Sequence, residues 1–159
     1  MIMNKKSAAL FTMPVLLLSG LFIFSEVSAH GGATGVVKER MELMKSMGDR
    51  MKEMGDMVKG KVDFDSASIA ASAQEIKQAA PEITHLFPEG SIDKPSEALP
   101  RIWKDRGKFD ELTETMIQEA AKLSDVATAG DKRSIMIQFT KLGKTCSSCH
   151  TDFRKKQEN

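Results

Sequence analysis

The sequence contains no tyrosine, a single tryptophan and only two cysteines among its 159 residues. It also lacks the alternating runs of β-branched and aromatic residues that are typical of strands. Basic and acidic residues nearly balance, with a formal net charge of +1, so the clustered basic excess of a nucleic-acid-binding surface is missing. These absences argue against a β-rich fold, a disulfide-dense scaffold and a nucleic-acid partner.

The first 29 residues have the three parts of a secretory signal peptide. Lys5 and Lys6 give a positive start, an apolar run follows from about residue 8 to 24, and Val27-Ser28-Ala29 has the small residues of a cleavage site. We predict cleavage after Ala29, the alternative being an uncleaved membrane anchor. Residues 30–159 then form one exported, periplasmic domain, in which no further apolar stretch is long enough to span a bilayer.

Apolar residues recur every three or four positions in four segments of this domain, which is the period of an amphipathic helix. The spacing predicts helices over residues 35–59, 66–86, 109–129 and 131–155. Asp65 or Ser66 and Asp131 are the expected N-caps. We expect a kink or break at Pro81, because proline removes a helical hydrogen bond and clashes with the preceding turn.

Residues 87–108 interrupt this pattern and are rich in turn-forming residues, namely Pro88, Gly90, Pro95, Pro100 and Gly107. We expect a long functional loop there, which Trp103 and Phe109 pack onto the rest of the domain. The other connections are short, so consecutive helices should be antiparallel neighbours. The sequence therefore predicts an all-α fold, an antiparallel up-down four-helix bundle.

The two cysteines lie close together near the C-terminus, in Cys146-Ser147-Ser148-Cys149-His150. C-x-x-C-H is the attachment signal of c-type haem. Residues three and four apart share one face of a helix, so both thiols can reach the vinyl groups on one porphyrin edge, and His150 can bind the iron as proximal ligand. A redox dithiol would normally accompany a βαβ pattern, and zinc would need more ligands than His30 and His85 supply. The sequence therefore predicts one covalent haem c, bound through Cys146 and Cys149.

Nearly the whole of residues 30–159 resembles the class II cytochromes c, the cytochrome c′ family. The motifs that carry the resemblance are Arg40-Met41-Glu42-Leu43-Met44-Lys45, Leu86-Phe87-Pro88-Glu89-Gly90-Ser91, Ala98-Leu99-Pro100-Arg101-Ile102-Trp103 with Phe109, and the haem motif followed by Phe153-Arg154. In one branch of this family the iron is five-coordinate and high-spin, and an apolar distal pocket admits nitric oxide or carbon monoxide. In the other branch a methionine of the first helix ligates the iron and gives a low-spin electron carrier.

The resemblance implies roles for three more residues. Met44 matches the position over the distal face of the haem, and we expect it to be the distal iron ligand, with core packing as the alternative. Arg40 matches a basic residue near the haem propionates, and Arg154 matches one near the proximal imidazole; the alternative for both is a solvated surface charge. His85 is expected at the surface.

The expected function is electron transfer by a periplasmic mono-haem cytochrome with His/Met-ligated iron. The alternative is a five-coordinate cytochrome c′ that binds nitric oxide or carbon monoxide. Enzymatic activity is not expected, because no distal histidine or carboxylate cluster is evident for acid–base catalysis. We expect a redox partner protein, but the sequence does not identify it. The resemblance also implies a homodimer through the first two helices. Met47, Met54 and Met57 would suit such a face, but core packing explains these methionines as well.

Overall fold

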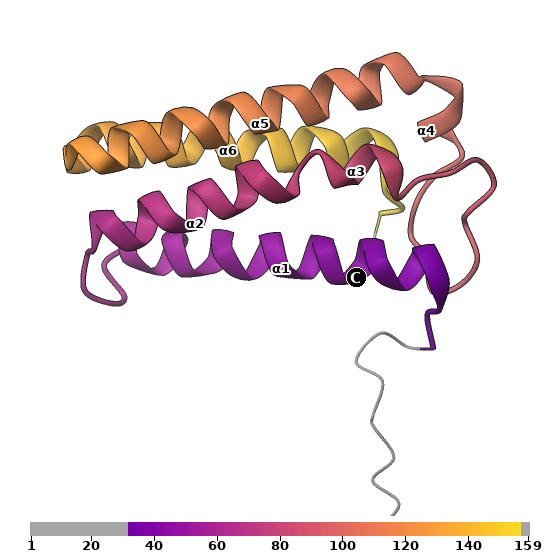
Figure 1. The fold of residues 1–159 in the computed structure, drawn as a ribbon, viewed down its shortest axis with the longest axis horizontal. Coiled ribbons are helices and arrows are strands. Elements are labelled where there is room, and N and C mark those ends of the chain that lie inside the picture. Colours follow the sequence, from indigo (N-terminus) through magenta and orange to yellow (C-terminus); the bar gives the residue numbers. More distant parts are fainter. Residues whose placement is uncertain (1–31, 157–159) are drawn as a thin grey trace, which may run out of the picture.

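The computed structural model describes residues 32–156, which form four long helices and two short ones (Figure 1). These are α1 (Gly35–Val58), α2 (Ser66–Ala79), α3 (Glu82–His85), α4 (Arg101–Lys104), α5 (Arg106–Ala129) and α6 (Lys132–Phe153). The described residues contain no strand, only an isolated bridge between Ala98 and Arg154. None of their helices is both long and apolar enough to cross a membrane. The predicted signal peptide and His30 lie outside the described residues.

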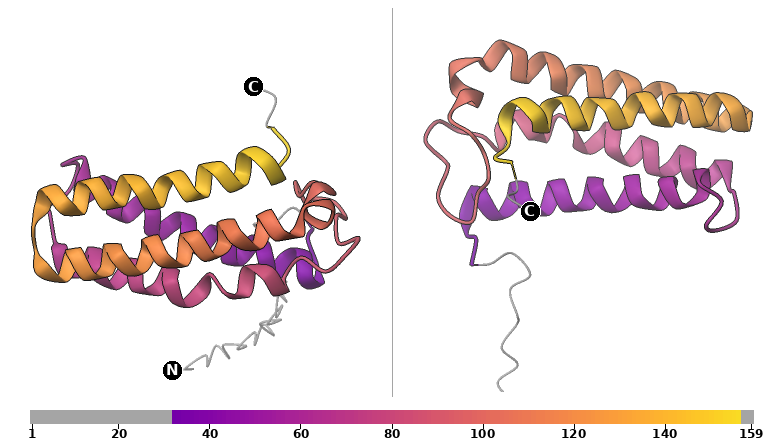
Figure 2. Two further views of the ribbon diagram at one scale, coloured as in Figure 1. Left: turned by 90° about the horizontal axis from the view of Figure 1, so that it is seen from above. Right: turned by 180° about the vertical axis from the view of Figure 1, so that it is seen from behind.

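The four long helices lie side by side along one axis, with α1 beside α2 and α5 beside α6 (Figures 1 and 2). Helix α2 packs along α5, and α5 packs along α6, over most of their lengths. Helices α1 and α6 approach each other at only a few residues, so their seam is the least closely packed of the four. The predicted four-helix bundle is confirmed, and its loosest seam carries the haem motif on one side.

The core consists of the apolar stripes of these helices. Its fully buried large side chains are Phe109, Met54, Ile69, Ile102, Leu123, Ile135 and Leu142. Burying one such side chain stabilises the fold by roughly 1.5–3 kcal/mol. Met47, Met54 and Met57 also lie in this core, so core packing, and not a dimer face, accounts for these methionines.

Helix boundaries follow the local chemistry of the chain. Asp65 caps α2 and Asp131 caps α6, each carboxylate accepting a hydrogen bond from a backbone N–H of the first turn, at 2.9 and 2.8 Å. The break at Pro81 is confirmed, because this residue separates α2 from α3. Helix α6 ends at Phe153, slightly before the predicted residue 155.

The connection between α3 and α5 contains more helix than predicted. Pro100, whose φ is −58°, directly precedes α4, since a proline ring fixes φ near the helical value. Helix α5 begins at Arg106, before the predicted start near Phe109. The three helical residues before Phe109 are not apolar, so the apolar stripe does not reveal them. Trp103 fastens the connection as expected: its indole Nε1 donates a hydrogen bond to the Phe87 carbonyl at 3.0 Å.

Gly130 ends α5 in the left-handed conformation, with φ of 81°. A Cβ at this position would meet no other atom within 4 Å, so substitution changes only the backbone energy. We expect Gly130→Ala to lower the free energy of unfolding by about 1–2 kcal/mol, because an L side chain clashes with its own carbonyl in this conformation. Urea denaturation measures the change.

Gly107→Ala is the matched control. Gly107 lies inside α5, and a Cβ there would also meet open space. Alanine is the better helix former by about 0.5–1 kcal/mol, so this variant should be as stable as the parent or more stable. A loss of stability equal to that of Gly130→Ala would contradict the explanation.

Candidate functional site

Two cavities lie between α1 and the C-terminal half of α6. The outer cavity, of about 430 Å³, is lined by α1, the connection before α4 and the end of α6. The inner cavity, of about 210 Å³, extends between the long helices. Met44, Gly48, Cys149 and His150 line both, so the cavities are two parts of one space, the α1–α6 hollow. Its size is typical of ligand sites, which measure about 300–1,000 Å³.

The two cysteines of the haem motif stand one turn apart on α6 and form no disulfide. Both are half-buried against the core. Burial raises the pKa of the Cys146 thiol, and burial, with the added charges of Cys146 and Asp152, raises the pKa of Cys149 to about 11. Redox-active dithiols have a lowered thiol pKa, so this environment argues against the redox interpretation of the motif.

His150 lines both parts of the hollow and remains accessible to solvent. Partial burial lowers the pKa of its imidazole; the charge of Arg154 lowers it further, and Glu97 opposes the shift. The neutral imidazole favoured in this way has the lone pair that a metal ion binds. Between residues 32 and 156 no three His, Cys, Asp or Glu side chains gather as a metal-binding group. His85 is exposed and lines neither cavity, as predicted.

Methionines of α1 form the wall that faces α6. Met44 is half-buried and lines both cavities, whereas Met47 and Met51 line only the inner one. The Thr113 and Thr145 hydroxyls at the inner wall donate hydrogen bonds to carbonyls of their own helices, at 3.0 and 2.7 Å. No carboxylate, lysine or arginine of the described residues lines the inner cavity, so its wall is mainly apolar.

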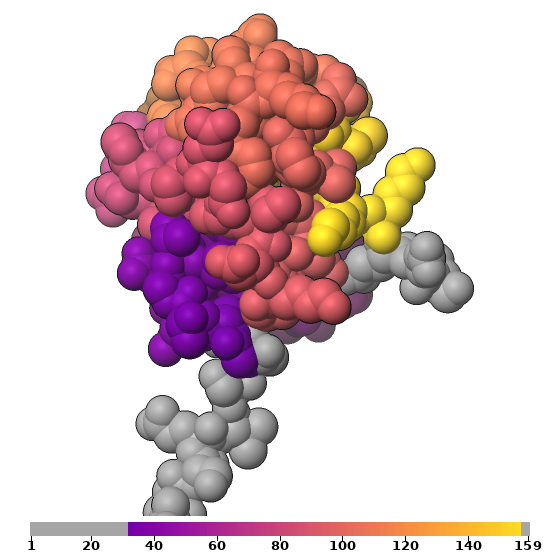
Figure 3. All heavy atoms as spheres, turned by 90° about the vertical axis from the view of Figure 1, so that its right-hand side faces the viewer, coloured from indigo at the N-terminus to yellow at the C-terminus, as the bar shows by residue number. Residues whose placement is uncertain are grey.

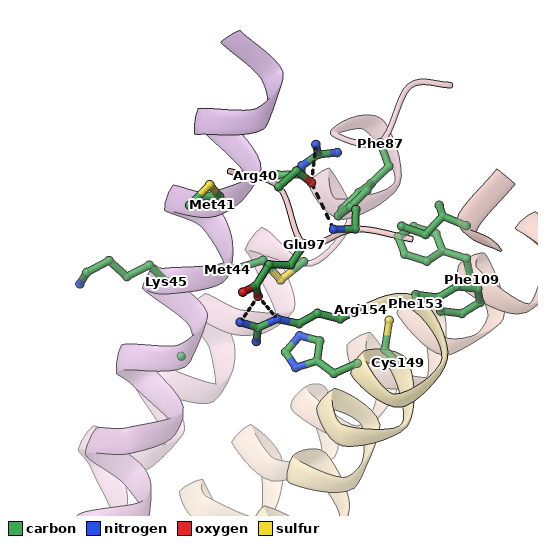
Figure 4. Close-up of a pocket in the computed structure, with 15 residues that line it drawn as sticks. Arg40, Met41, Met44, Lys45, Phe87, Glu97, Phe109, Cys149, Phe153 and Arg154 are labelled. Carbon is green, nitrogen blue, oxygen red and sulfur yellow. Dashed lines mark hydrogen bonds and ion pairs between the residues drawn. The ribbon is translucent and has the colours of Figure 1, made fainter. Parts of the chain in front are cut away.

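Arg40 lines the outer cavity but is directed toward the connection after α3. It is only 3% exposed. Its guanidinium donates hydrogen bonds to the Ser91 and Ser96 hydroxyls, each at 3.1 Å, and to the Ser91 carbonyl. It also lies 4.7 Å from the centroid of the Phe87 ring (Figure 4). Burial lowers the pKa of Arg40, against the opposing charge of Asp93. Arg40 thus fastens this connection to α1, and its role toward a haem propionate stays a prediction.

Arg154 forms an ion pair with Glu97 at the mouth of the hollow (Figure 4). Its Nε and one terminal nitrogen lie 2.6 and 2.5 Å from the same carboxylate oxygen of Glu97. Sequence analysis identified Arg154 but missed Glu97. The partners are 57 residues apart and Glu97 lies in a loop, so no periodic pattern indicates the contact.

Three phenylalanines close the same end of the bundle. Phe109 packs edge-to-face against Phe87 and Phe153, with ring centroids 5.2 and 5.3 Å apart. Figure 3 looks onto this end, where α1, the connection and the C-terminal residues meet. Phe87 directly follows the C-cap of α3 and therefore belongs to the connection. The predicted packing of Phe109 against the connection is confirmed by its contact with Phe87.

The residues of the hollow fit a c-type haem. Two protonated thiols one turn apart could attach the porphyrin edge, and the adjacent imidazole could bind the iron. The mainly apolar walls would exclude water from the macrocycle, and the loose seam between α1 and α6 gives the space for it. These features define a helical-bundle cytochrome of the c type.

A family model described as Cytochrome C' matches residues 35–154. Among curated relatives, cytochrome c′ of Rhodocyclus tenuis is 39% identical over 62 residues, which cover 39% of this chain and 47% of the relative. Cytochrome c-556 of Rhodopseudomonas palustris is 33% identical over 79 residues, covering 45% of this chain and 50% of the relative. The chain thus spans about half the length of these curated relatives.

Solved structures match over a longer stretch. Cytochrome c′ from Rhodopseudomonas palustris has a TM-score of 0.73 and 32% identity, covering 79% of this chain and all of that one. A nitric oxide complex of a cytochrome c prime variant from Alcaligenes xylosoxidans has a TM-score of 0.69 and 30% identity, covering 76% of this chain and 94% of that one. The chain belongs to the cytochrome c′ family, and it carries one covalent haem c.

Arg40→Lys tests the fastening of the connection after α3. Lysine keeps the charge but lacks the planar fork that reaches both serines. A hydrogen bond to a charged group contributes about 1.5–3 kcal/mol, so we expect the free energy of unfolding to fall by about 2 kcal/mol and proteolysis within residues 87–98 to accelerate. Urea denaturation and limited proteolysis measure these effects. The control Glu39→Gln, one residue earlier and exposed, should change neither, and an unaltered cleavage rate in Arg40→Lys would contradict the assignment.

Proposed function

We propose that this protein is a mono-haem cytochrome c′ that binds a small diatomic gas, such as nitric oxide, at the haem iron. The observation that carries the proposal is the asymmetry of the α1–α6 hollow. An imidazole lies on the α6 side, and beside it lies a mainly apolar inner cavity that no carboxylate, lysine or arginine within residues 32–156 lines. The nitric oxide complexes among the similar structures support this class of ligand. We therefore propose gas binding in place of electron transfer, which the sequence alone favoured.

The proposal gives each residue of the motif one task. Cys146 and Cys149 would hold the haem through thioether links, and His150 would bind its iron. The bound haem supplies an iron centre that can take a diatomic ligand and change its oxidation state by one electron. Helix α6 keeps the three side chains in register, because they fall within little more than one turn.

Met44 controls the opposite face in this proposal. Its side chain reaches the hollow from α1, and the inner cavity beside it has a volume of about 210 Å³. Methionine is flexible and unbranched, so Met44 can turn into this space and admit a small ligand. The role assigned to Met44 is therefore that of a gate above the iron.

Electron transfer, in which Met44 would be a second ligand of the iron, is the second candidate. The position of Met44 favours it, since this thioether lines the same space as His150 from the opposite helix. Because no carboxylate lines the inner cavity among the described residues, neither candidate includes acid–base catalysis. The proposal includes three further predictions. They are export to the periplasm, a contact between Arg40 and a haem propionate, and a homodimer formed through α1 and α2.

The absorption spectrum and nitric oxide binding of Met44→Ala separate the two candidates. We expect the ferric and ferrous parent protein to be high-spin, and Met44→Ala to keep this spin state. Removing the gate should raise the nitric oxide association rate about tenfold, which corresponds to about 1.4 kcal/mol in the barrier. Stopped-flow mixing of the ferrous protein with nitric oxide measures the rate.

Met136→Ala is the matched control, because Met136 is 41% exposed on α6 and lines neither cavity. This variant should behave as the parent does. A low-spin parent protein that becomes high-spin only in Met44→Ala would overturn gas binding and support the methionine-ligated electron carrier.

A further inference from the structure

Glu97 occupies a distinct place in the charge pattern of the outer cavity. The basic residues lining this cavity are Arg40, Lys45 and Arg154, and Glu97 is the one carboxylate among the described residues that line it. Lys45 pairs with Asp49 outside the cavity, at 2.6 Å. Glu97 is thus the acidic group that offsets the positive charge at the mouth of the haem site.

Backbone hydrogen bonds fix Glu97 opposite Arg154. The Lys155 amide donates to the Glu97 carbonyl at 2.8 Å, and the Leu99 amide donates to the Phe153 carbonyl at 2.9 Å. These bonds tie the segment before α4 to the end of α6 on both sides of the ion pair. The side chains of Glu97 and Arg154 are 39% and 43% exposed, so the pair lies at the rim of the hollow.

Both charges lie close to His150. Arg154 follows His150 by one helical turn, and Glu97, Arg154 and His150 line the same outer cavity. The fields of the two side chains therefore reach the imidazole with opposite signs. An iron bound to this imidazole would be subject to the same two fields.

We propose that Glu97 is a positioning residue of the haem site, which holds Arg154 at the mouth of the hollow and offsets its charge, so that the pair sets the reduction potential of the haem. This inference rests on the proposed function, in which His150 binds the iron. Glu97 is not part of the haem motif of α6; it lies in the connection before α4.

The direction of the effect follows from charge alone. Reduction adds one electron, which dithionite supplies in the test, and lowers the charge at the iron by one unit. A nearby positive charge favours the ferrous state, and a nearby negative charge favours the ferric state. Removing the Glu97 charge should therefore raise the potential, and removing the Arg154 charge should lower it.

The test is a redox titration of four haem-loaded, full-length proteins at low ionic strength, namely the parent, Glu97→Gln, Arg154→Gln and the double variant. We expect Glu97→Gln to raise the equilibrium constant for reduction about threefold and Arg154→Gln to lower it about threefold. Each shift is about 28 mV, since tenfold corresponds to about 59 mV for a one-electron couple. The double variant should return close to the parent.

Asp125→Asn removes the same charge near the far end of α5, where Asp125 is exposed, and should leave the potential unchanged.

Thermal unfolding of the same proteins separates charge from structure. Both single variants should melt below the parent, because each breaks the ion pair. A purely structural clamp predicts this loss without opposite shifts in potential, so potentials that move in the same direction, or not at all, would overturn the inference. A parent protein without covalent haem would instead refute the proposed function, which keeps the two failures distinct.

Discussion

The helical repeat of α6 is the constraint on which the rest of the structure depends. Cys146, Cys149 and His150 can serve one haem only if they share a face, and α6 provides that face within little more than one turn. A haem held in this way needs space beside α6. The bundle provides it by keeping α1 away from α6, while α5 packs closely against both α2 and α6.

The hollow is divided by its chemistry. Its inner part is mainly apolar, with methionines of α1 on one wall, and suits a small uncharged ligand. Its outer part has a charged rim, formed by Glu97 and Arg154, and three packed phenylalanine rings line the same cavity. Ligand binding and the electrostatic setting of the iron are thus assigned to different parts of one site. Met44 lines both parts, and its role, as a gate or as an iron ligand, distinguishes gas binding from electron transfer.

The sequence predicts much of this because periodic patterns report local structure. The four apolar stripes, the caps at Asp65 and Asp131 and the break at Pro81 all depend on neighbours along the chain, and all are present. The start of α5 was placed too late because its first turn is polar. The pattern leaves both a dimer face and core packing open for Met47, Met54 and Met57. A helix rich in methionine offers more apolar positions than one face needs, and the pattern does not say which of them turn inward. The sequence does not reveal the role of Glu97, because its ion pair with Arg154 joins segments that are far apart in the chain. The roles assigned to Cys146, Cys149, His150, Met44, Arg40 and Arg154 toward haem stay predictions.

Every role proposed for the hollow requires that the haem is attached covalently at α6, and a haem stain of the unfolded protein on a denaturing gel measures this attachment. The stain should stay with the parent polypeptide and with the control Ser147→Ala/Ser148→Ala, and it should be lost from Cys146→Ala/Cys149→Ala. Haem that leaves the parent polypeptide on unfolding, or a stain that persists in the variant without cysteines, would refute covalent attachment at these two residues.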